Sequence, residues 1–155
     1  MKHPIKYIAI MALTLLFALA ASAQEKKIKK ADMPPAVQKA ADEQSKGATV
    51  KGYSTEVEDG KTLYEVELAV NGHSKDVSMT PDGAVVEVEE EVALNSLPAE
   101  VQEGLKKKAG AGKITKVESL TKQGKLVAYE AQVRTNGKKS EVQVGPDGKP
   151  LAHPE

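Results

Sequence analysis

The sequence contains no cysteine and no tryptophan, and aromatic residues make up only 3% of its 155 positions. Without cysteine the chain has no disulfide to stabilise it, no thiol for lipid attachment, and no zinc site of the usual cysteine and histidine type. With so few aromatic rings, the hydrophobic core must be thin and largely aliphatic. The fold therefore has to be held together by burial alone.

An excess of one charge is also absent, because 22 basic residues balance 22 acidic ones. This balance excludes a generally basic nucleic-acid-binding protein. The charges are nevertheless unevenly placed: residues 24–92 carry 9 lysines against 15 acids, a net charge of −6, and residues 93–155 carry 11 basic residues against 7 acids, a net charge of +4. Halves of opposite net charge favour contact with each other within one molecule, or head-to-tail pairing between molecules. Random drift of surface residues explains the charge difference equally well.

A single long apolar run, from Ile8 to Ala20, lies near the N-terminus behind two lysines. It ends at Ala21-Ser22-Ala23, which fits the small-x-small rule of signal peptidase cleavage. The run is shorter than the roughly 18 to 20 residues that span a bilayer. The sequence therefore predicts a cleaved signal peptide (1–23), a flexible basic tail (24–31), and a periplasmic or secreted chain that is not stably inserted in the membrane.

The second half of the chain repeats the first. A shift of 64 aligns Pro34 with Pro98 and Gln38 with Gln102, and one inserted residue then changes the shift to 65. The later matches are Tyr64-Glu65 with Tyr129-Glu130, Asn71-Gly72 with Asn136-Gly137, and Pro81-Asp82-Gly83 with Pro146-Asp147-Gly148. Matches at turns as well as in strands indicate a tandem duplication, with repeats at 32–92 and 93–155.

Each repeat reads as a helix followed by antiparallel strands. The first helix is expected to begin near Asp32 and end at Gly47, and the second to have Ser96 as its N-cap and end at Gly110. Apolar and polar residues then alternate, and each Asn-Gly predicts a two-residue hairpin. The predicted fold class is α+β: two tandem repeats, each a helix packed on a small antiparallel sheet whose other face is wet. Whether the two sheets join is left open.

Groups for catalysis are scarce. His73 lies at a predicted turn and His153 near the C-terminus, and neither is part of a pattern that would activate a nucleophile. The acidic run at Glu87, Glu89, Glu90 and Glu91 could gather a hard cation, but alternating glutamates are more typical of a solvated edge strand. We therefore expect no catalytic residue, no cofactor and no dedicated metal site, with weak calcium binding left open.

The chain resembles the PepSY domain and the related PepSY-like domain likened to the β-lactamase-inhibitor protein. The resemblance rests on Met33 to Gln38 and Leu97 to Gln102, on the Tyr-Glu strands, and on the Asn-Gly and Pro-Asp-Gly turns. It implies exported or membrane-attached bacterial proteins that act by binding, with control or inhibition of peptidases. No catalytic residue comes with the family. The second repeat departs from the pattern, because Pro150 and Pro154 interrupt its fourth strand.

The open sheet faces are the candidate partner-binding surface. Their predicted residues are Glu65, Glu67, Asp76, Ser78, Glu130, Gln132, Arg134, Glu141 and Gln143. Tight inhibitory surfaces usually rest on Trp, Tyr and Arg anchors, so this set suits a weak or charged partner better. The preferred function is a non-enzymatic exported binding module that modulates or inhibits an envelope or secreted peptidase. The alternative is a structural or self-associating periplasmic protein, and an exported hydrolase is a remote third.

Overall fold

The structure is a computed structural model that describes residues 25–58 and 60–155. Their strands form one antiparallel sheet in which every strand pairs with its neighbours in the chain. The strands are β1 (Lys26–Lys27), β2 (Thr49–Glu58), β3 (Lys61–Val70), β4 (His73–Met79), β5 (Val85–Glu91), β6 (Lys113–Lys122), β7 (Lys125–Thr135) and β8 (Lys138–Val144).

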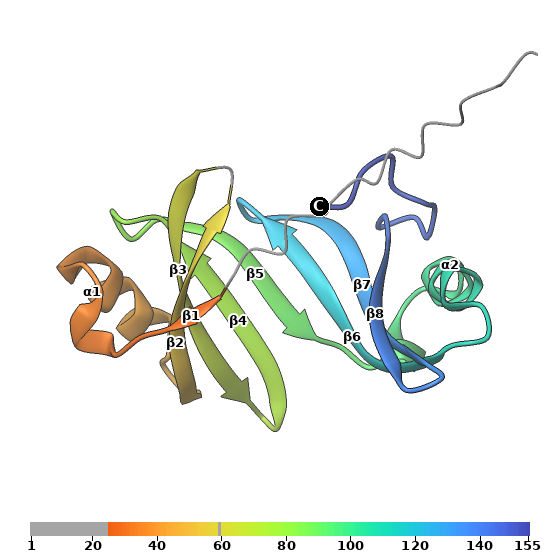
Figure 1. The fold of residues 1–155 in the computed structure, drawn as a ribbon, viewed down its shortest axis with the longest axis horizontal. Helices are drawn as coiled ribbons and strands as arrows, with labels where there is room; N and C mark the ends of the chain where they lie inside the picture. The colour runs from red at the N-terminus through yellow and green to blue at the C-terminus, as the bar shows by residue number, and fades with distance from the viewer. Residues whose placement is uncertain (1–24, 59) are drawn as a thin grey trace, which may run out of the picture.

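Two α-helices, α1 (Pro35–Gln44) and α2 (Ala99–Ala109), pack on this sheet, and each follows a short 3₁₀ helix, η1 (Lys30–Asp32) or η2 (Leu94–Ser96). Figure 1 shows α1 and α2 at opposite ends of the molecule, with the strands between them. No helix among the described residues is long and apolar enough to cross a membrane. The predicted signal peptide lies outside the described residues.

The prediction of two small sheets, one per repeat, is wrong. Strand β5 pairs with β6 from Glu87 opposite Lys122 to Glu91 opposite Glu118, so the two halves share one continuous eight-stranded sheet. The physical reason is that separate sheets would leave the backbone N–H and C=O groups of two long strands unpaired. Consequently the glutamates of β5 lie inside the sheet and do not form a solvated edge.

The predicted Asn-Gly hairpins are confirmed. Asn71 and Asn136 both have φ of 51°, and the glycines that follow them also have positive φ. Two consecutive positive φ angles are what the two-residue turn between right-twisted strands requires. These turns fix the register of β3 with β4 and of β7 with β8.

The predicted helix starts are corrected by a few residues. Asp32 lies in η1 and Ser96 in η2, and the two α-helices begin after Pro34 and Pro98. Pro34 and Pro98 are the N-cap residues, with extended ψ of 147° and 145°, so each helix starts at the residue that follows. The glutamine of each Pro-x-x-Val-Gln motif then bonds backwards: the Nε2 atoms of Gln38 and Gln102 donate to the carbonyl oxygens of Met33 and Leu97, each at 2.9 Å.

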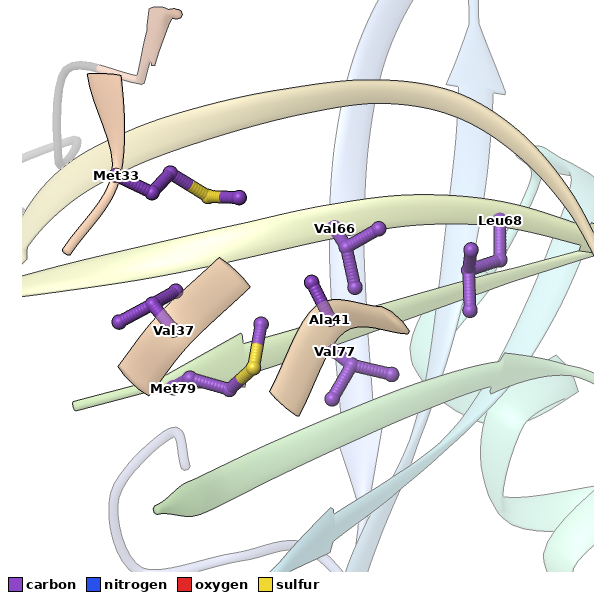
Figure 2. Packing of buried hydrophobic residues seen from close by; sticks show 7 residues of the cluster. All are labelled: Met33, Val37, Ala41, Val66, Leu68, Val77 and Met79. Carbon is purple, nitrogen blue, oxygen red and sulfur yellow. The ribbon is translucent and has the colours of Figure 1, made fainter. Parts of the chain in front are cut away.

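Two hydrophobic clusters form the core, one under each helix. Figure 2 shows the first, in which Met33 and the α1 side chains lie against β3 and β4; its members are Met33, Val37, Ala41, Val66, Leu68, Val77 and Met79. The second joins α2 to β6, β7 and β8, through Val101, Leu105, Val117, Ala131, Val133 and Val144. All of these side chains are at most 3% exposed, so a largely aliphatic core suffices.

Both helices cover the same face of the sheet. A row of paired residues runs across the sheet from Val66 in β3 through Val77 in β4 and Val88 in β5 to Thr121 in β6. Val117 lies four residues from Thr121 along β6. Side chains two or four residues apart in a strand share a face, so Val117 under α2 is on the α1 side. Since the helices share a face but lie at opposite ends of the molecule, the sheet is bent with the helices outside (Figure 1). The face without helices, called the open face below, is concave.

The ends of the sheet differ. The sequence predicts a flexible tail at residues 24–31, whereas the structure pairs β1 with Ser54 and Thr55 of β2. At the other end β8 has no full strand beyond it among the described residues, and only a single bridge joins Val144 to Pro150. The shortened second repeat anticipated at Pro150 thus leaves most of β8 as an open edge.

Candidate binding face

The structure places all nine predicted partner-binding residues on the open face. Glu65 lies opposite Ser78 and Glu67 opposite Asp76 in β3 and β4. In β7 and β8 the corresponding pairs are Glu130 with Gln143, Gln132 with Glu141, and Arg134 with Lys139. Because the sheet is continuous, these residues belong to one surface instead of two. Their role in binding a partner stays a prediction.

Strands β5 and β6 bring further charged residues to the open face that the sequence reading missed. They are Glu87, Glu89 and Glu91 in β5, and Lys116, Glu118 and Lys122 in β6. The signal was present in the alternation of glutamate with valine from Val86 to Glu91. Taken alone, this alternation predicts a solvated edge strand, because nothing local in the sequence shows that β5 pairs with β6.

A carboxyl cluster lies at the middle of this face, across three adjacent strands. Asp76, Glu89 and Glu118 each offer an oxygen, and these oxygens lie within 4.8 Å of one another. Lys116 Nζ lies 2.6 Å from Glu118 Oε1, and the Glu118 side chain is only 5% exposed. The cluster therefore combines three acids with one close ammonium group in a partly dry environment.

Burial raises the pKa of two members of the cluster. The pKa of Glu89 rises to about 8, first because of desolvation and then because of the nearby Glu118. Glu89 lies opposite the buried Leu120 on β6, which helps to exclude water. The pKa of Asp76 rises to about 6, again chiefly through desolvation, with Lys116 opposing the rise. Burial disfavours the charged form of a carboxyl group, so these two hold protons at a higher pH than usual.

A second group of acids lies on the first half of the face. Glu25, Glu65 and Glu67 bring carboxyl oxygens within 4.8 Å of one another, and Lys27 Nζ lies 3.2 Å from Glu67 Oε1. The pKa of Glu65 rises to about 7 because of desolvation and the nearby Asp76, although Ser54 Oγ donates a hydrogen bond to it at 3.3 Å. Ser54 itself is 1% exposed, which reflects how the concave face closes over its own side chains.

The second half of the face is less crowded with acids. Gln143 Nε2 donates to Glu130 Oε2 at 2.8 Å, and desolvation still raises the pKa of Glu130. Lys122 Nζ lies 3.3 Å from Glu87 and 3.8 Å from Glu58, so it links the two halves. The backbone N–H of Glu155 donates to Gln143 Oε1 at 2.9 Å, which brings the C-terminal residues to the rim of the face.

Carboxylates in this arrangement can bind hard cations or the cationic side chains of a partner. Histidines contribute little to the surface: His73 Nδ1 lies 3.9 Å from Glu91 at the end of β4, and His153 lies in the exposed C-terminal segment. The geometry thus favours ionic recognition over nucleophilic or acid-base chemistry by a histidine.

Neither a family model nor a curated protein matches this sequence. Solved structures do match in fold. A protein of Bacteroides eggerthii DSM 20697, described as periplasmic, superposes with a TM-score of 0.60 at 21% identity, over 76% of this chain and 84% of that one. A DUF2874 family protein of Bacteroides ovatus ATCC 8483 gives 0.59 at 22% identity, over 77% and 86%. A BLIP-like protein of Bacteroides fragilis NCTC 9343 gives 0.56 at 20% identity, over 77% and 83%.

The chain has the fold of these BLIP-like and DUF2874 proteins. The similarity extends over about three quarters of the chain and therefore includes parts of both halves. It supports the BLIP-like part of the sequence resemblance, while membership of the PepSY family itself stays a prediction. At these identities the comparison establishes the fold alone.

Proposed function

We propose that this chain is a non-enzymatic, periplasmic or secreted binding module that uses its open face to hold a basic segment of a partner protein. The observation that carries the proposal is the charge of that face. Carboxyl groups from β3 to β7 converge there, and the lysines that oppose them in ion pairs are Lys27, Lys116 and Lys122. A protein of similar fold is described as periplasmic, which agrees with the proposed location.

A cationic partner suits this surface for two reasons. Charge-assisted hydrogen bonds to half-buried carboxylates are stronger than neutral ones. Complementary charge also steers the encounter and selects the partner more than it raises the affinity. The interaction should therefore be specific for basic segments, moderate in strength and weakened by salt.

Within this class, we propose an envelope peptidase as the first partner to test, because the resemblance to PepSY domains implies control of peptidases. A purified peptidase from the source envelope would be assayed with increasing amounts of residues 24–155. A fall in turnover that saturates with added protein would support this finer proposal. Unchanged turnover, together with binding of a non-peptidase, would leave only the broader binding role.

The broader role is tested by crosslinking residues 24–155 to proteins of the envelope fraction. The test variant carries Glu65→Gln, Glu67→Gln and Glu130→Gln, which remove acids from the open face without changing their size. The matched control carries Glu43→Gln, Glu100→Gln and Glu103→Gln on the two helices. A basic partner lost by the first variant and kept by the second supports the proposal, and a partner retained equally by both contradicts it.

Self-association is the second candidate, favoured by the exposed lysines of α2. Lys106, Lys107 and Lys108 form the last turn of that helix, at the opposite end of the molecule from α1. A second copy could place this end against the acidic open face. Sedimentation at low and high salt would show larger species only at low salt, and a salt-independent monomer would exclude this candidate.

A further inference from the structure

We infer that the open face exchanges protons for its cationic partner: the free face holds protons among Asp76, Glu89 and Glu65, and these leave to solvent when basic side chains bind. The inference rests on the proposed function and adds its regulation. Binding should then be weak in mildly acidic conditions and strong in mildly alkaline ones. No covalent bond changes, and the released protons pass to the buffer.

The geometry of the central cluster favours such a proton. Three carboxyl groups bring oxygens within 4.8 Å of one another, and the close ammonium group of Lys116 contacts Glu118. Like charges at this spacing in a partly dry site repel one another, and one ammonium group for three carboxyl groups leaves much of that repulsion in place. A proton is the smallest cation that relieves the repulsion, and it stays until a larger one replaces it.

The charged groups around the cluster strengthen this argument. Those acting on Asp76, Glu89 and Glu65 are Glu25 before β1, Glu56 in β2, Glu67 in β3, Glu87 in β5, Lys116 and Glu118 in β6, and Glu130 in β7. Lys27 pairs with Glu67, and Lys122 pairs with Glu87 and Glu58. Acids on the flanking strands of the open face therefore surround the cluster, and the nearest lysines are already engaged in ion pairs.

The raised pKa values of three carboxyl groups on the open face agree with a proton being held there. Desolvation raises the pKa of Glu89 to about 8, of Glu65 to about 7 and of Asp76 to about 6. An arriving guanidinium group stabilises the carboxylate form and lowers these values. By linkage, each proton released makes the association constant rise by up to about tenfold per pH unit.

The test is calorimetric titration of residues 24–155 with an arginine-rich peptide blocked at both ends. Arginine keeps its charge throughout the range from about pH 6 to about pH 8.5, so the peptide itself does not titrate. Each titration is repeated in two buffers of different ionisation enthalpy, which gives the number of protons released. A peptide with citrulline in place of arginine controls for contacts that do not depend on charge.

The variant that isolates the effect is Glu89→Gln, which imitates the protonated side chain. Its matched control is Glu90→Gln, the next residue along β5, whose side chain is on the helix-covered side. For the wild type and for Glu90→Gln we expect tighter binding at higher pH, accompanied by proton release. In Glu89→Gln the number of protons released should fall by about one, and the association constant should rise less steeply with pH. The difference cancels contributions from histidines elsewhere in the chain.

The outcomes separate the inference from the function on which it rests. Binding with the same affinity at all pH values and no proton release overturns the inference and leaves the proposed function standing. A peptide that fails to bind at any pH overturns both. Equal proton release by the wild type and Glu89→Gln overturns the assignment of the protons to the central cluster.

Discussion

In each half of the molecule the Pro-Asp-Gly turn packs against the helix of that half, but the turn lies closer to the helix in the second half than in the first. In the first half a Cβ added to Gly83 would lie 2.7 Å from the carbonyl oxygen of Ala36 in α1. In the second half the corresponding distance, from Gly148 to Glu100 in α2, is 2.1 Å, and a Cβ on Gly104 would lie 2.1 Å from the Gly148 carbonyl oxygen. Alanine occupies position 40 of α1, which aligns with Gly104. The Pro-Asp-Gly turn therefore docks more closely where the helix also supplies glycine.

The largest expected difference between the two halves comes from filling that closer contact. Gly148→Ala should destabilise the protein by about 3 to 4 kcal/mol, because it adds a backbone collision to the strain of a positive φ. Gly83→Ala should cost about 2 to 3 kcal/mol for the same reasons at a longer distance. Urea unfolding measures both. Gly137→Ala is the control, since Gly137 has positive φ but open space around it, and about 1 kcal/mol is expected. Equal losses at the three positions would contradict the comparison.

Truncating the two cores asks whether the halves are independent. Met79 of β4 and Leu105 of α2 are fully buried, one in each of the two hydrophobic clusters. Met79→Ala and Leu105→Ala should each destabilise by about 2 to 5 kcal/mol. Because the sheet is continuous, each substitution should shift one cooperative transition seen by circular dichroism and by calorimetry. Two transitions, with only one shifted by each variant, would show that the halves unfold separately despite the shared sheet.

Removing the lysine at the junction tests how the charges of the halves meet. Lys116→Met leaves the nearly buried Glu118 beside Asp76 and Glu89 without its close ammonium group. Breaking a fully buried pair costs about 3 to 5 kcal/mol, and the Lys116 side chain is 24% exposed, so about 2 kcal/mol is expected. Chemical unfolding at neutral pH measures the loss. Lys125→Met, at an exposed turn, should change stability little, and a similar loss in both variants would contradict the buried role of Lys116.

The smallest predicted effect is the pH dependence of stability, which should differ between the aligned residues Glu65 and Glu130. An acid whose pKa is higher in the folded than in the unfolded state stabilises the fold at low pH, and that contribution is lost as pH rises through the folded value. Glu65, Asp76 and Glu89 have such values, at about 7, 6 and 8. The free energy of unfolding should therefore fall between about pH 5 and pH 8.5, by an amount of order 1 kcal/mol after allowance for partial exposure, and the melting temperature should fall with it.

The two halves should contribute unequally to this dependence. Glu65→Gln should flatten the fall in melting temperature more than Glu130→Gln, since the pKa of Glu65 is raised to about 7 and Glu130 accepts a bond from Gln143. Thermal unfolding at several pH values gives the comparison. A melting temperature that rises with pH would show that these carboxyl groups are better solvated than the structure indicates.

Local features of the fold could be predicted from the sequence because short-range chemistry determines them. The Asn-Gly turns, the alternation around Tyr64 and the helix stops follow from φ preferences and side-chain period. The join between β5 and β6 could not be predicted, since pairing of distant strand edges leaves no local signal. That join is also what brings Glu89 to Glu118, so the centre of the candidate site was missed with it, while Glu65 and Glu130 on hairpin strands were placed on the open face.

The open edge of β8 has a consequence for the behaviour of the protein at high concentration. Its unpaired backbone groups could pair with another strand, but Lys138 and Lys139 are exposed there and Pro150 bridges the end of the strand at Val144. Ammonium groups and proline resist pairing with a neighbouring edge, since burying the charge is costly and proline lacks the donor. The edge of β8 should therefore disfavour strand pairing between copies, and with it fibril growth, in a β-rich chain that has no disulfide to limit its unfolding.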